Sequence, residues 1–237
     1  MPDPLQSFLQ RSKQRVERRY ADTSYTDCYI AFLDVLGMKN LVQEQQYEDM
    51  RKLFNVVEIA KEVYGRIGVE GGQKFLEESQ IRATAMSDSV VLSINADTDQ
   101  ALSKIIGFSS YLIQGFLTAL NQPVFIRGGI VRGGVFHQGE TVFGPGLIDA
   151  YYLEEKEAIN MRCIISKSLY QEQAFKDYIN LSSNGLKQDI GGYFFINFLR
   201  DENKKRLAEH CSLMLGSDIN EAVKNKYKWL KNYIDGE

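Results

Sequence analysis

The chain has 237 residues, of which 44% are hydrophobic and 25% charged, and its formal net charge is −3. This composition is typical of a globular protein, and the small net charge gives no general attraction to nucleic acid or to an anionic membrane. No apolar run approaches the ~18 residues of a membrane span, and the N-terminus lacks the apolar core of a signal peptide. Three widely separated cysteines and two histidines predict neither disulfides nor a Cys- or His-based zinc site. We therefore expect a cytoplasmic protein.

The N-terminal half of the chain alternates strand and helix patterns. Residues 4–20 predict an amphipathic helix whose Arg and Lys side chains form either a solvated face or a partner-binding arm. Residues 28–34 predict a buried strand, and apolar residues at helical spacing predict a helix over 39–66. A turn is expected at 69–73, and residues 81–94 predict two short strands joined at a Ser-Asp-Ser turn.

The second half continues the alternation and then adds further elements. The predicted elements are a helix over 99–121, a strand with glycine breaks over 122–138, a helix over 147–160, strands over 162–165 and 191–199, and a helical tail from 202. The order β-α-β-β-α-β followed by additions predicts an α+β fold built on a ferredoxin-like split unit, with helices on one face of an antiparallel sheet. We divide the chain into an N-terminal helical extension (1–27), one main domain (28–200) and a C-terminal helical extension (201–237) packed on that domain.

Two aspartates carry the chemistry that the residues suggest. Asp34 ends the apolar strand of the sequence YIAFLDVLGM, and a buried carboxylate needs a helix N-terminus to cap, a basic partner or a cation. Asp88 lies in the hairpin turn, and the split unit would place its strands beside the first strand. With the Val35 carbonyl, the two carboxylates form an oxygen set suited to Mg²⁺ or Mn²⁺, which also bind substrate phosphates. The alternatives are a helix cap at Asp34 and an Asx turn at Asp88.

Other nucleotide-binding patterns are weak or absent. Leu36 to Lys39 turn into a helix, and helix N-termini bind phosphate. The chain has neither GxxxxGK[ST] nor a GxGxxG that opens a helix after a strand, which disfavours a P-loop enzyme and a Rossmann fold. The glycines of RGGIVRGG equally suit a strand that another backbone approaches closely. His137 and His210 do not assemble a convincing Ser-His-Asp set.

Four blocks of sequence support a more specific interpretation. They are FLDVLGM (32–38), MSDSVVLS (86–93), FIRGGIVRGGVF (125–136) and ETVFGPGLIDAYYLE (140–154). In this order they resemble the class III nucleotidyl cyclases, and most closely the bacterial pyrimidine cyclases of the Pycsar antiphage systems. The resemblance implies that 28–200 is a catalytic domain, in which Asp34, the Val35 carbonyl and Asp88 bind two Mn²⁺ or Mg²⁺ ions per site.

The departures from that family are informative. Purine cyclases carry Asn and Arg in the helix of the fourth block, and these positions fall on Ile148 and Tyr152. The position of the base-reading Lys falls on Thr84, with Arg82 on the same strand face, and that of the base-reading Asp or Cys falls on Thr141. Because the purine-recognition residues are absent while the metal-binding aspartates are present, the resemblance implies a nucleotide substrate with a smaller base.

The resemblance implies a complete function. We expect a uridylate cyclase that converts UTP to 3′,5′-cyclic UMP and pyrophosphate as a second messenger of antiphage defence, acting through a separate effector protein. The expected nucleotide contacts are Leu36, Gly37, Met38, Lys39, Arg82, Thr84, Thr141 and Tyr152, with Arg127, Arg132 or Lys39 as phosphate-binding cations. The sites would lie between the subunits of a head-to-tail homodimer, with no membrane or nucleic-acid partner. The alternatives are a cytidylate cyclase using CTP, a catalytically silent nucleotide-binding signalling domain, and a ferredoxin-like module that binds no nucleotide.

Overall fold

The computed structural model describes residues 24–43, 47–66, 81–182 and 184–236, with a few isolated positions before residue 15. Apart from those positions, the predicted helix over 4–20 lies outside these residues, as does the predicted turn at 69–73. Among the described helices, none combines the length and the apolar character that a membrane span requires.

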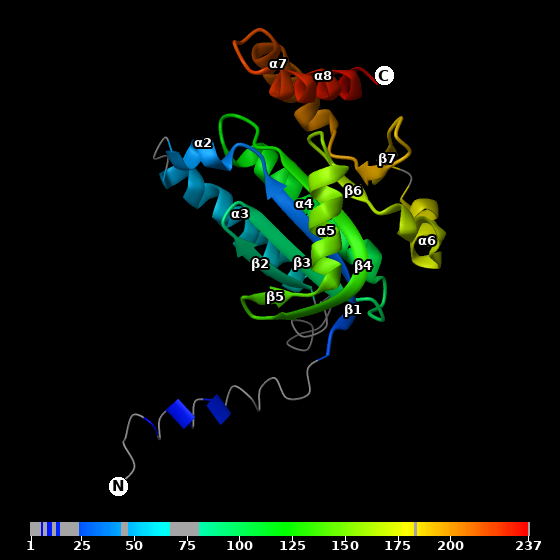
Figure 1. Ribbon diagram of the computed structural model, residues 1–237. Helices are drawn as coiled ribbons and strands as arrows, with labels where there is room; N and C mark the ends of the chain where they lie inside the picture. The colour runs from blue at the N-terminus through cyan, green and yellow to red at the C-terminus, as the bar shows by residue number, and fades with distance from the viewer. Residues whose placement is uncertain are drawn as a thin grey trace.

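An eight-stranded mixed sheet forms the centre of the molecule (Figure 1). The strands are β1 (Thr26–Val35), β2 (Arg82–Met86), β3 (Ser89–Asn95), β4 (Ile126–Gln138), β5 (Thr141–Phe143), β6 (Cys163–Ile165), β7 (Leu186–Gln188) and β8 (Phe194–Ile196). Their order is β2-β3-β1-β4-β6-β8-β7, with β5 paired to β4. Within this sheet, the pair β4–β6 is parallel and the other described pairs are antiparallel.

Helices cover both faces of the sheet and extend beyond one end of it. They are α2 (Met38–Gln43), α3 (Tyr47–Arg66), α4 (Ala101–Ala119), α5 (Pro145–Lys156), the 3₁₀ helix η1 (Lys167–Gln171), α6 (Gln173–Leu181), α7 (Asp201–Leu215) and α8 (Glu221–Asp235). The predicted helix over 39–66 is thus two helices, α2 and α3, and the predicted helical tail is the pair α7 and α8.

The expected split unit is confirmed. The chain runs β1, α3, β2, β3, α4, β4, and the first four strands lie in the order β2-β3-β1-β4, which is the ferredoxin-like arrangement. β5, α6, β7 and η1 were not predicted, because these short segments lack the three consecutive apolar residues that mark the equally short strands β6 and β8.

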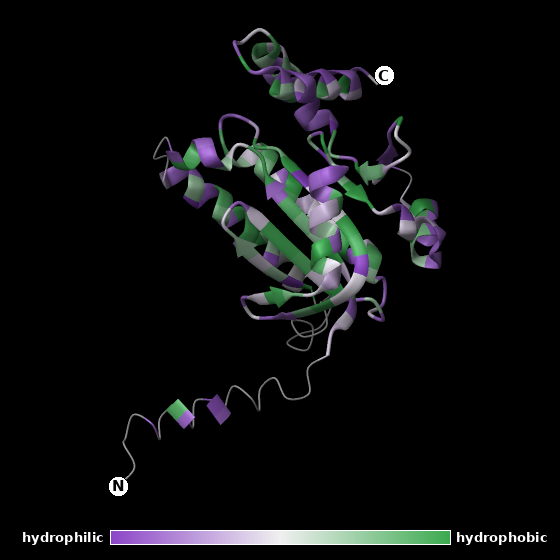
Figure 2. Cartoon of the chain, viewed as in Figure 1, coloured by the Kyte–Doolittle hydropathy of each residue, from purple (hydrophilic) through white to green (hydrophobic). Residues whose placement is uncertain are grey.

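The faces of the sheet explain why β1 is almost continuously apolar. Tyr29, Ala31 and Leu33 point into the main core with α3 and α4, whereas Cys28 and Ile30 point into a second cluster beneath α5. Because both faces of the sheet are covered, β1 lacks the alternation of apolar and polar residues that a strand with one solvent-exposed face shows. Figure 2 shows this as hydrophobic strands enclosed by helices with hydrophilic outer sides. The expectation that helices lie on one face holds for α3 and α4 but not for α5.

Glycines on β4 let α5 lie close to the sheet. A Cβ atom at Gly129 would stand 2.8 Å from the Ala150 carbonyl oxygen, and one at Gly133 would stand 2.9 Å from the Gly146 Cα. The glycines of β4 therefore allow the backbone of α5 to lie close to this strand, as one interpretation of the sequence RGGIVRGG predicted.

The C-terminal helices are joined to the core by polar contacts as well as apolar ones. Arg206 of α7 donates from Nη1 to the Leu117 carbonyl at 2.8 Å and from Nη2 to the Asn121 carbonyl at 3.1 Å, at the end of α4. Leu207 and Leu230 belong to the main hydrophobic core. The α7–α8 pair therefore packs on the same core as the sheet.

Candidate functional site

The candidate site begins with a partly buried group of charges at the end of β1. Asp34 pairs with Arg127 across the β1–β4 ladder, and Arg127 Nη2 donates to Asp34 Oδ2 at 3.2 Å. Arg127 Nε forms a second ion pair with Glu154 Oε1 of α5. The Glu154 side chain is only 3% exposed, so the guanidinium is held between a carboxylate of the sheet and a carboxylate of the helix above it.

The environment of these carboxylates favours their neutral forms. Burial raises the pKa of Asp34, while the Arg127 charge opposes this rise and the Asp88 charge adds to it. Burial likewise raises the pKa of Glu154 to about 7, with Arg127 opposing the rise and Asp34 adding to it. A cation placed beside Asp34 would relieve the repulsion among these acidic groups.

Asp88 reaches the same end of the sheet from the neighbouring hairpin. Asp34 pairs with Ser89, and the Val35 N–H donates to the Asp88 carbonyl oxygen at 2.8 Å. Ser87, the first residue of the turn, has φ of 55°, which turns the chain so that Asp88 lies at its tip. The structure thus brings the two predicted aspartates together.

The donor set at this end of the sheet fits a hard divalent cation. It consists of two carboxylates that repel each other and the nearby Val35 carbonyl, all oxygen donors. Within the described ranges, no three His, Cys, Asp or Glu side chains gather as a metal-ligand set. Further ligands would therefore be phosphate oxygens and water, as is usual for Mg²⁺.

The turn after β1 differs from the predicted phosphate loop in one respect. Gly37 has φ of +84°, a conformation that glycine adopts at little cost, and α2 begins directly after it at Met38. The Leu36 N–H donates to the Phe125 carbonyl oxygen at 2.9 Å, so this group is already bonded within the chain. Lys39 is exposed on the first turn of α2.

Thr84, a predicted base contact, belongs to a buried hydrogen-bond network. Its hydroxyl donates to the Gly139 carbonyl at 3.0 Å and lies 2.9 Å from His137 Nε2, while Ser93 Oγ lies 2.8 Å from His137 Nδ1. Since the Thr84 proton goes to Gly139, Nε2 carries the imidazole proton and Ser93 donates to Nδ1. His137 was not predicted to do anything; here it fastens the β4–β5 hairpin to β2 and β3.

The remaining predicted contacts are spread over the surface. Arg82 donates from Nη1 to Asn95 Oδ1 at 3.0 Å and lies on the same strand face as Thr84. Thr141 is exposed on β5, and Tyr152 is 52% exposed on the outer side of α5. None of these side chains contacts Asp34 in the described part of this protomer.

Arg132 is held away from the two aspartates. It pairs with Tyr29 on the opposite face of the sheet from Asp34, and its guanidinium donates to Asp27 at 2.7 Å and to Glu172 at 3.2 Å. Of the two arginines predicted to bind phosphate, the structure therefore brings only Arg127 to Asp34.

Two charged residues near Asp34 were missed by sequence reasoning. The buried position of Glu154 could have been predicted from the sequence, because Glu154 lies four residues after Ala150 and eight after Gly146, on the same side of the helix α5. Lys226 of α8 had none: its charge acts on Asp34, Arg127 and Glu154 only because α8 folds back over the end of the sheet.

Comparison with known proteins gives a structural likeness only. Neither a protein-family model nor a curated protein sequence matches the chain. The catalytic core of a rhodopsin-guanylyl cyclase with converted specificity, solved with ATPαS, is 14% identical with a TM-score of 0.49, over 73% of this chain and 96% of that one.

Two structures of a bacterial light-regulated adenylyl cyclase also resemble the chain. One is 12% identical with a TM-score of 0.47, over 98% of this chain and 70% of that one. The other is 13% identical with a TM-score of 0.45, over 77% and 95%. At such identities and TM-scores these likenesses carry no argument about activity, which depends on the residues of the site.

Proposed function

We propose that the protein is a nucleotidyl cyclase that converts UTP to 3′,5′-cyclic UMP and pyrophosphate. The observation that supports this most is the pair Asp34 and Asp88 at the end of the central strand, with Arg127 beside Asp34. In the reaction, the 3′-hydroxyl loses its proton to water and its oxygen bonds to the α-phosphorus, the bond from the α-phosphorus to the oxygen bridging to the β-phosphorus breaks, and pyrophosphate leaves.

The residues of the chain provide position and charge. Asp34, Asp88 and the Val35 carbonyl would hold two Mn²⁺ or Mg²⁺ ions, which supply positive charge that acidifies the 3′-hydroxyl and binds the triphosphate. Arg127 offers its guanidinium to phosphate oxygens, and Glu154 holds that guanidinium in place while Asp34 is engaged elsewhere. Phosphoryl transfer asks little else of a protein, because positioning and electrostatics supply most of the catalysis.

The pyrimidine preference rests on Arg82 and Thr141. Uracil presents the O4 acceptor and the N3–H donor, and cytosine reverses this pair. Arg82 can donate to O4, and the exposed Thr141 hydroxyl can donate or accept. The Thr84 hydroxyl is already bonded to Gly139 and His137, so we assign Thr84 to support of this strand face.

The site is completed by a second subunit in this proposal. The outer side of α5 exposes the large apolar residues Ile148, Tyr151 and Tyr152, at 54%, 41% and 52%. Exposed apolar residues that gather in a contiguous patch are a typical feature of protein interfaces. A head-to-tail homodimer would carry metal ligands on one subunit and base contacts on the other. The role in antiphage defence and the separate effector follow from the sequence resemblance alone.

A specific observation favours a second candidate. Asp34 is already neutralised by Arg127, and Ile148 and Tyr152 occupy positions where purine cyclases carry polar groups. A domain that binds a nucleotide and signals without turnover would have the same features.

One experiment separates the candidates. The protein is incubated with each of ATP, GTP, CTP and UTP and with Mn²⁺, Mg²⁺ or EDTA, and products are identified by mass spectrometry. We expect cyclic UMP and pyrophosphate, at least as fast with Mn²⁺ as with Mg²⁺ and not at all in EDTA. A rise in melting temperature that requires both the nucleotide and a divalent cation, without product, would indicate the silent domain; neither product nor such a rise would reject both.

The base assignment has its own test. We expect Arg82→Ala to lower UTP turnover more than triphosphate binding, and Thr141→Val to reduce the discrimination between UTP and CTP, because a polar group of the bound base would then lose its hydrogen-bond partner. If both variants leave the UTP/CTP ratio of kcat/KM unchanged, other residues read the base.

A further inference from the structure

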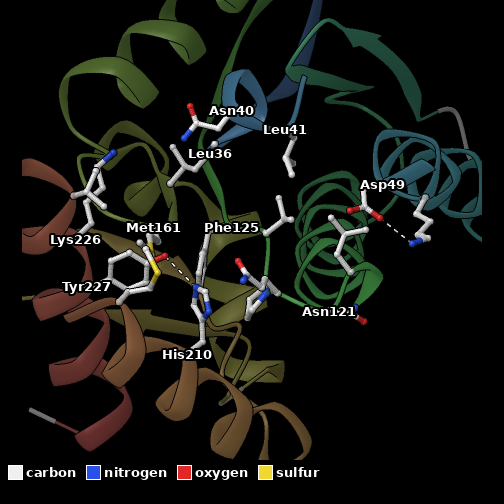
Figure 3. Close-up of a pocket in the computed structure, with 18 residues that line it drawn as sticks. Leu36, Asn40, Leu41, Asp49, Asn121, Phe125, Met161, His210, Lys226 and Tyr227 are labelled. Atoms are coloured by element: carbon white, nitrogen blue, oxygen red, sulfur yellow. Dashed lines mark hydrogen bonds and ion pairs between the residues drawn. The ribbon is translucent and has the colours of Figure 1, made fainter. Parts of the chain in front are cut away.

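A cavity of about 710 Å³ lies where the α7–α8 pair meets the core (Figure 3). Its walls come from the turn at Leu36–Gly37 and the helices α2 and α3 that follow it, the connection at 120–125 between α4 and β4, Met161, and the two C-terminal helices. This volume falls within the ~300–1,000 Å³ typical of small-molecule sites. Neither Asp34 nor Asp88 is among the described residues that line it.

One wall of the cavity is aromatic and uncharged. The ring centroids of Phe125 and His210 are 6.1 Å apart at 35°, and those of Phe125 and Tyr227 are 6.2 Å apart at 85°. His210 Nε2 and the Tyr227 hydroxyl are hydrogen-bonded at 3.1 Å. Burial lowers the pKa of His210 and raises the pKa of Tyr227 to about 12, so both are neutral near pH 7. Such a wall suits a planar ring.

Lys226 provides a cation beside this wall. It lines the cavity next to Tyr227, is partly buried, and has no hydrogen-bond or ion-pair partner within the described residues. By contrast, Lys228 on the same helix pairs with Glu221 at 2.8 Å, and Lys52 on the opposite wall pairs with Asp49 at 2.8 Å. Because this ammonium is partly buried and forms no direct hydrogen bond or ion pair among the described residues, it can form strong, charge-assisted hydrogen bonds with a bound anion.

The rim of the cavity adds groups that can both donate and accept. The amides of Asn40 and Asn121 line it, and Figure 3 shows Asn40 on the same side as Lys226. Amide side chains of this kind can bind sugar hydroxyls. The cavity thus combines an aromatic wall, an open cation and neutral polar groups.

We propose that this cavity binds a nucleoside phosphate, with the heteroaromatic ring against Phe125, His210 and Tyr227 and the phosphate on Lys226. The site requires neither Asp34 and Asp88 nor a divalent cation. The charge of Lys226 also acts on Asp34 and Glu154, but binding can be measured in EDTA, where no cyclase reaction is expected, so either proposal can fail while the other stands.

The six methionines of the chain offer a located readout. Met161 and Met214 line the cavity, whereas Met86 lies on β2 beside the turn that carries Asp88. Protein labelled with ¹³C at the methionine methyl groups is titrated with UMP, CMP, AMP and GMP in EDTA. We expect saturable shifts of the Met161 and Met214 signals with at least one of them, and an unchanged Met86 signal.

Matched variants identify the contacts. Lys226→Gln should weaken binding by about 10-fold or more, since hydrogen bonds to charged groups are the strong ones. Lys228→Gln removes the same charge from the same helix outside the cavity and should bind as the wild type does. His210→Ala should weaken binding by about 5-fold or more through lost stacking; it also serves as the test if Lys226→Gln does not fold.

Several outcomes would overturn the proposal. They are no shift of Met161 and Met214 at millimolar concentrations of any of the four nucleotides, shifts at Met86 in their place, and binding that neither Lys226→Gln nor His210→Ala weakens. Inorganic phosphate or the unphosphorylated nucleoside binding as tightly as the nucleotide would also reject it, because one of the two contacts would then contribute nothing.

Discussion

Asp34 is tolerated at the end of an apolar strand because Arg127 faces it. Its side chain is 19% exposed and that of Arg127 is 22% exposed, so the pair is mostly shielded from water. The sequence allowed a helix N-terminus, a basic residue or a cation as the partner of this carboxylate, and in the structure the partner is the basic residue Arg127. Glu154 holds the other side of the same guanidinium, so Arg127 keeps a partner if Asp34 turns to a cation.

Removing either aspartate should abolish the proposed reaction without unfolding the protein. In Asp34→Ala and in Asp88→Ala, a single carboxylate cannot hold two cations against water, and we expect cyclase turnover to fall by at least about 1,000-fold. Melting temperatures should change little, because Arg127 keeps Glu154 and one like-charge repulsion is removed. The control is Asp218→Ala, which removes an exposed carboxylate between α7 and α8. Near-normal turnover in either variant would contradict the metal assignment.

His137 should make the protein sensitive to mild acid. Burial lowers its pKa to about 4 in the folded protein, against about 6.5 in an unfolded chain. Between these values the unfolded chain binds more protons, so the free energy of unfolding decreases as the pH falls from about 7 toward 4, and this loss ends below 4.

The measurement compares the wild type with His137→Gln, whose amide can still donate to Thr84 but does not titrate. Between about pH 7.5 and pH 5, we expect the wild type to lose about 2 kcal/mol more unfolding free energy than the variant. Denaturant unfolding at the two pH values gives both numbers. Equal losses would mean that burial does not lower the pKa of this imidazole in the folded state.

At the scale of elements, the approach of α5 to β4 positions half of the candidate site. Glu154 reaches Arg127 only because Gly129 and Gly146 allow the helix backbone to lie directly on the strands. A Cβ at Gly146 would stand 2.6 Å from Ile30 Cδ1. Small residues at this interface are thus a requirement of the site as well as of the packing.

Gly129→Ala should destabilise the protein and disturb the site together. Its new methyl group would press on the Ala150 carbonyl, and overpacking of this kind costs about 1–3 kcal/mol. The matched control is Gly216→Ala at the end of α7, where φ is −85° and the nearest atoms are 3.6 Å away. Denaturant unfolding should therefore separate the two variants, and equal stabilities would show that α5 can shift freely.

At the scale of the whole molecule, α7 and α8 close one end of the sheet and form the nucleoside phosphate cavity with it. The opposite, outer side of α5 is left with exposed apolar residues, which supports the proposed homodimer. None of the described residues that line the cavity belongs to α5, so the proposed dimer surface and the cavity use different residues.

A heterodimer tests whether the site is shared between subunits. Asp34→Ala and Arg82→Ala chains carrying different tags are co-expressed, and the mixed dimer is purified. If each site combines Asp34 of one subunit with Arg82 of the other, the mixed dimer has one intact site of two and roughly half of the wild-type activity. Each variant alone should be far less active. A mixed dimer no more active than the two parents would contradict the shared site, and a monomeric wild type by light scattering would reject the dimer.

The sequence alone determined the core unit and the two aspartates. The apolar run of β1, the hairpin of β2 and β3 and the long pattern of α4 are local signals, and their order implies which strands are neighbours. The meeting of Asp34 and Asp88 follows from that order without further information. The short strands β5 and β7 escaped prediction because, unlike the equally short β6 and β8, they do not consist of consecutive apolar residues.

The partners of those aspartates were decided by the tertiary structure. Arg127 faces Asp34 across 93 residues of sequence, and a shift of one residue in the β1–β4 register would turn it to the other face of the sheet. Glu154 and Lys226 come from helices whose position depends on the packing of glycines and of the C-terminal pair. A residue's type and place in the sequence show that it can carry a charge, but only the packed chain determines which other charge it meets.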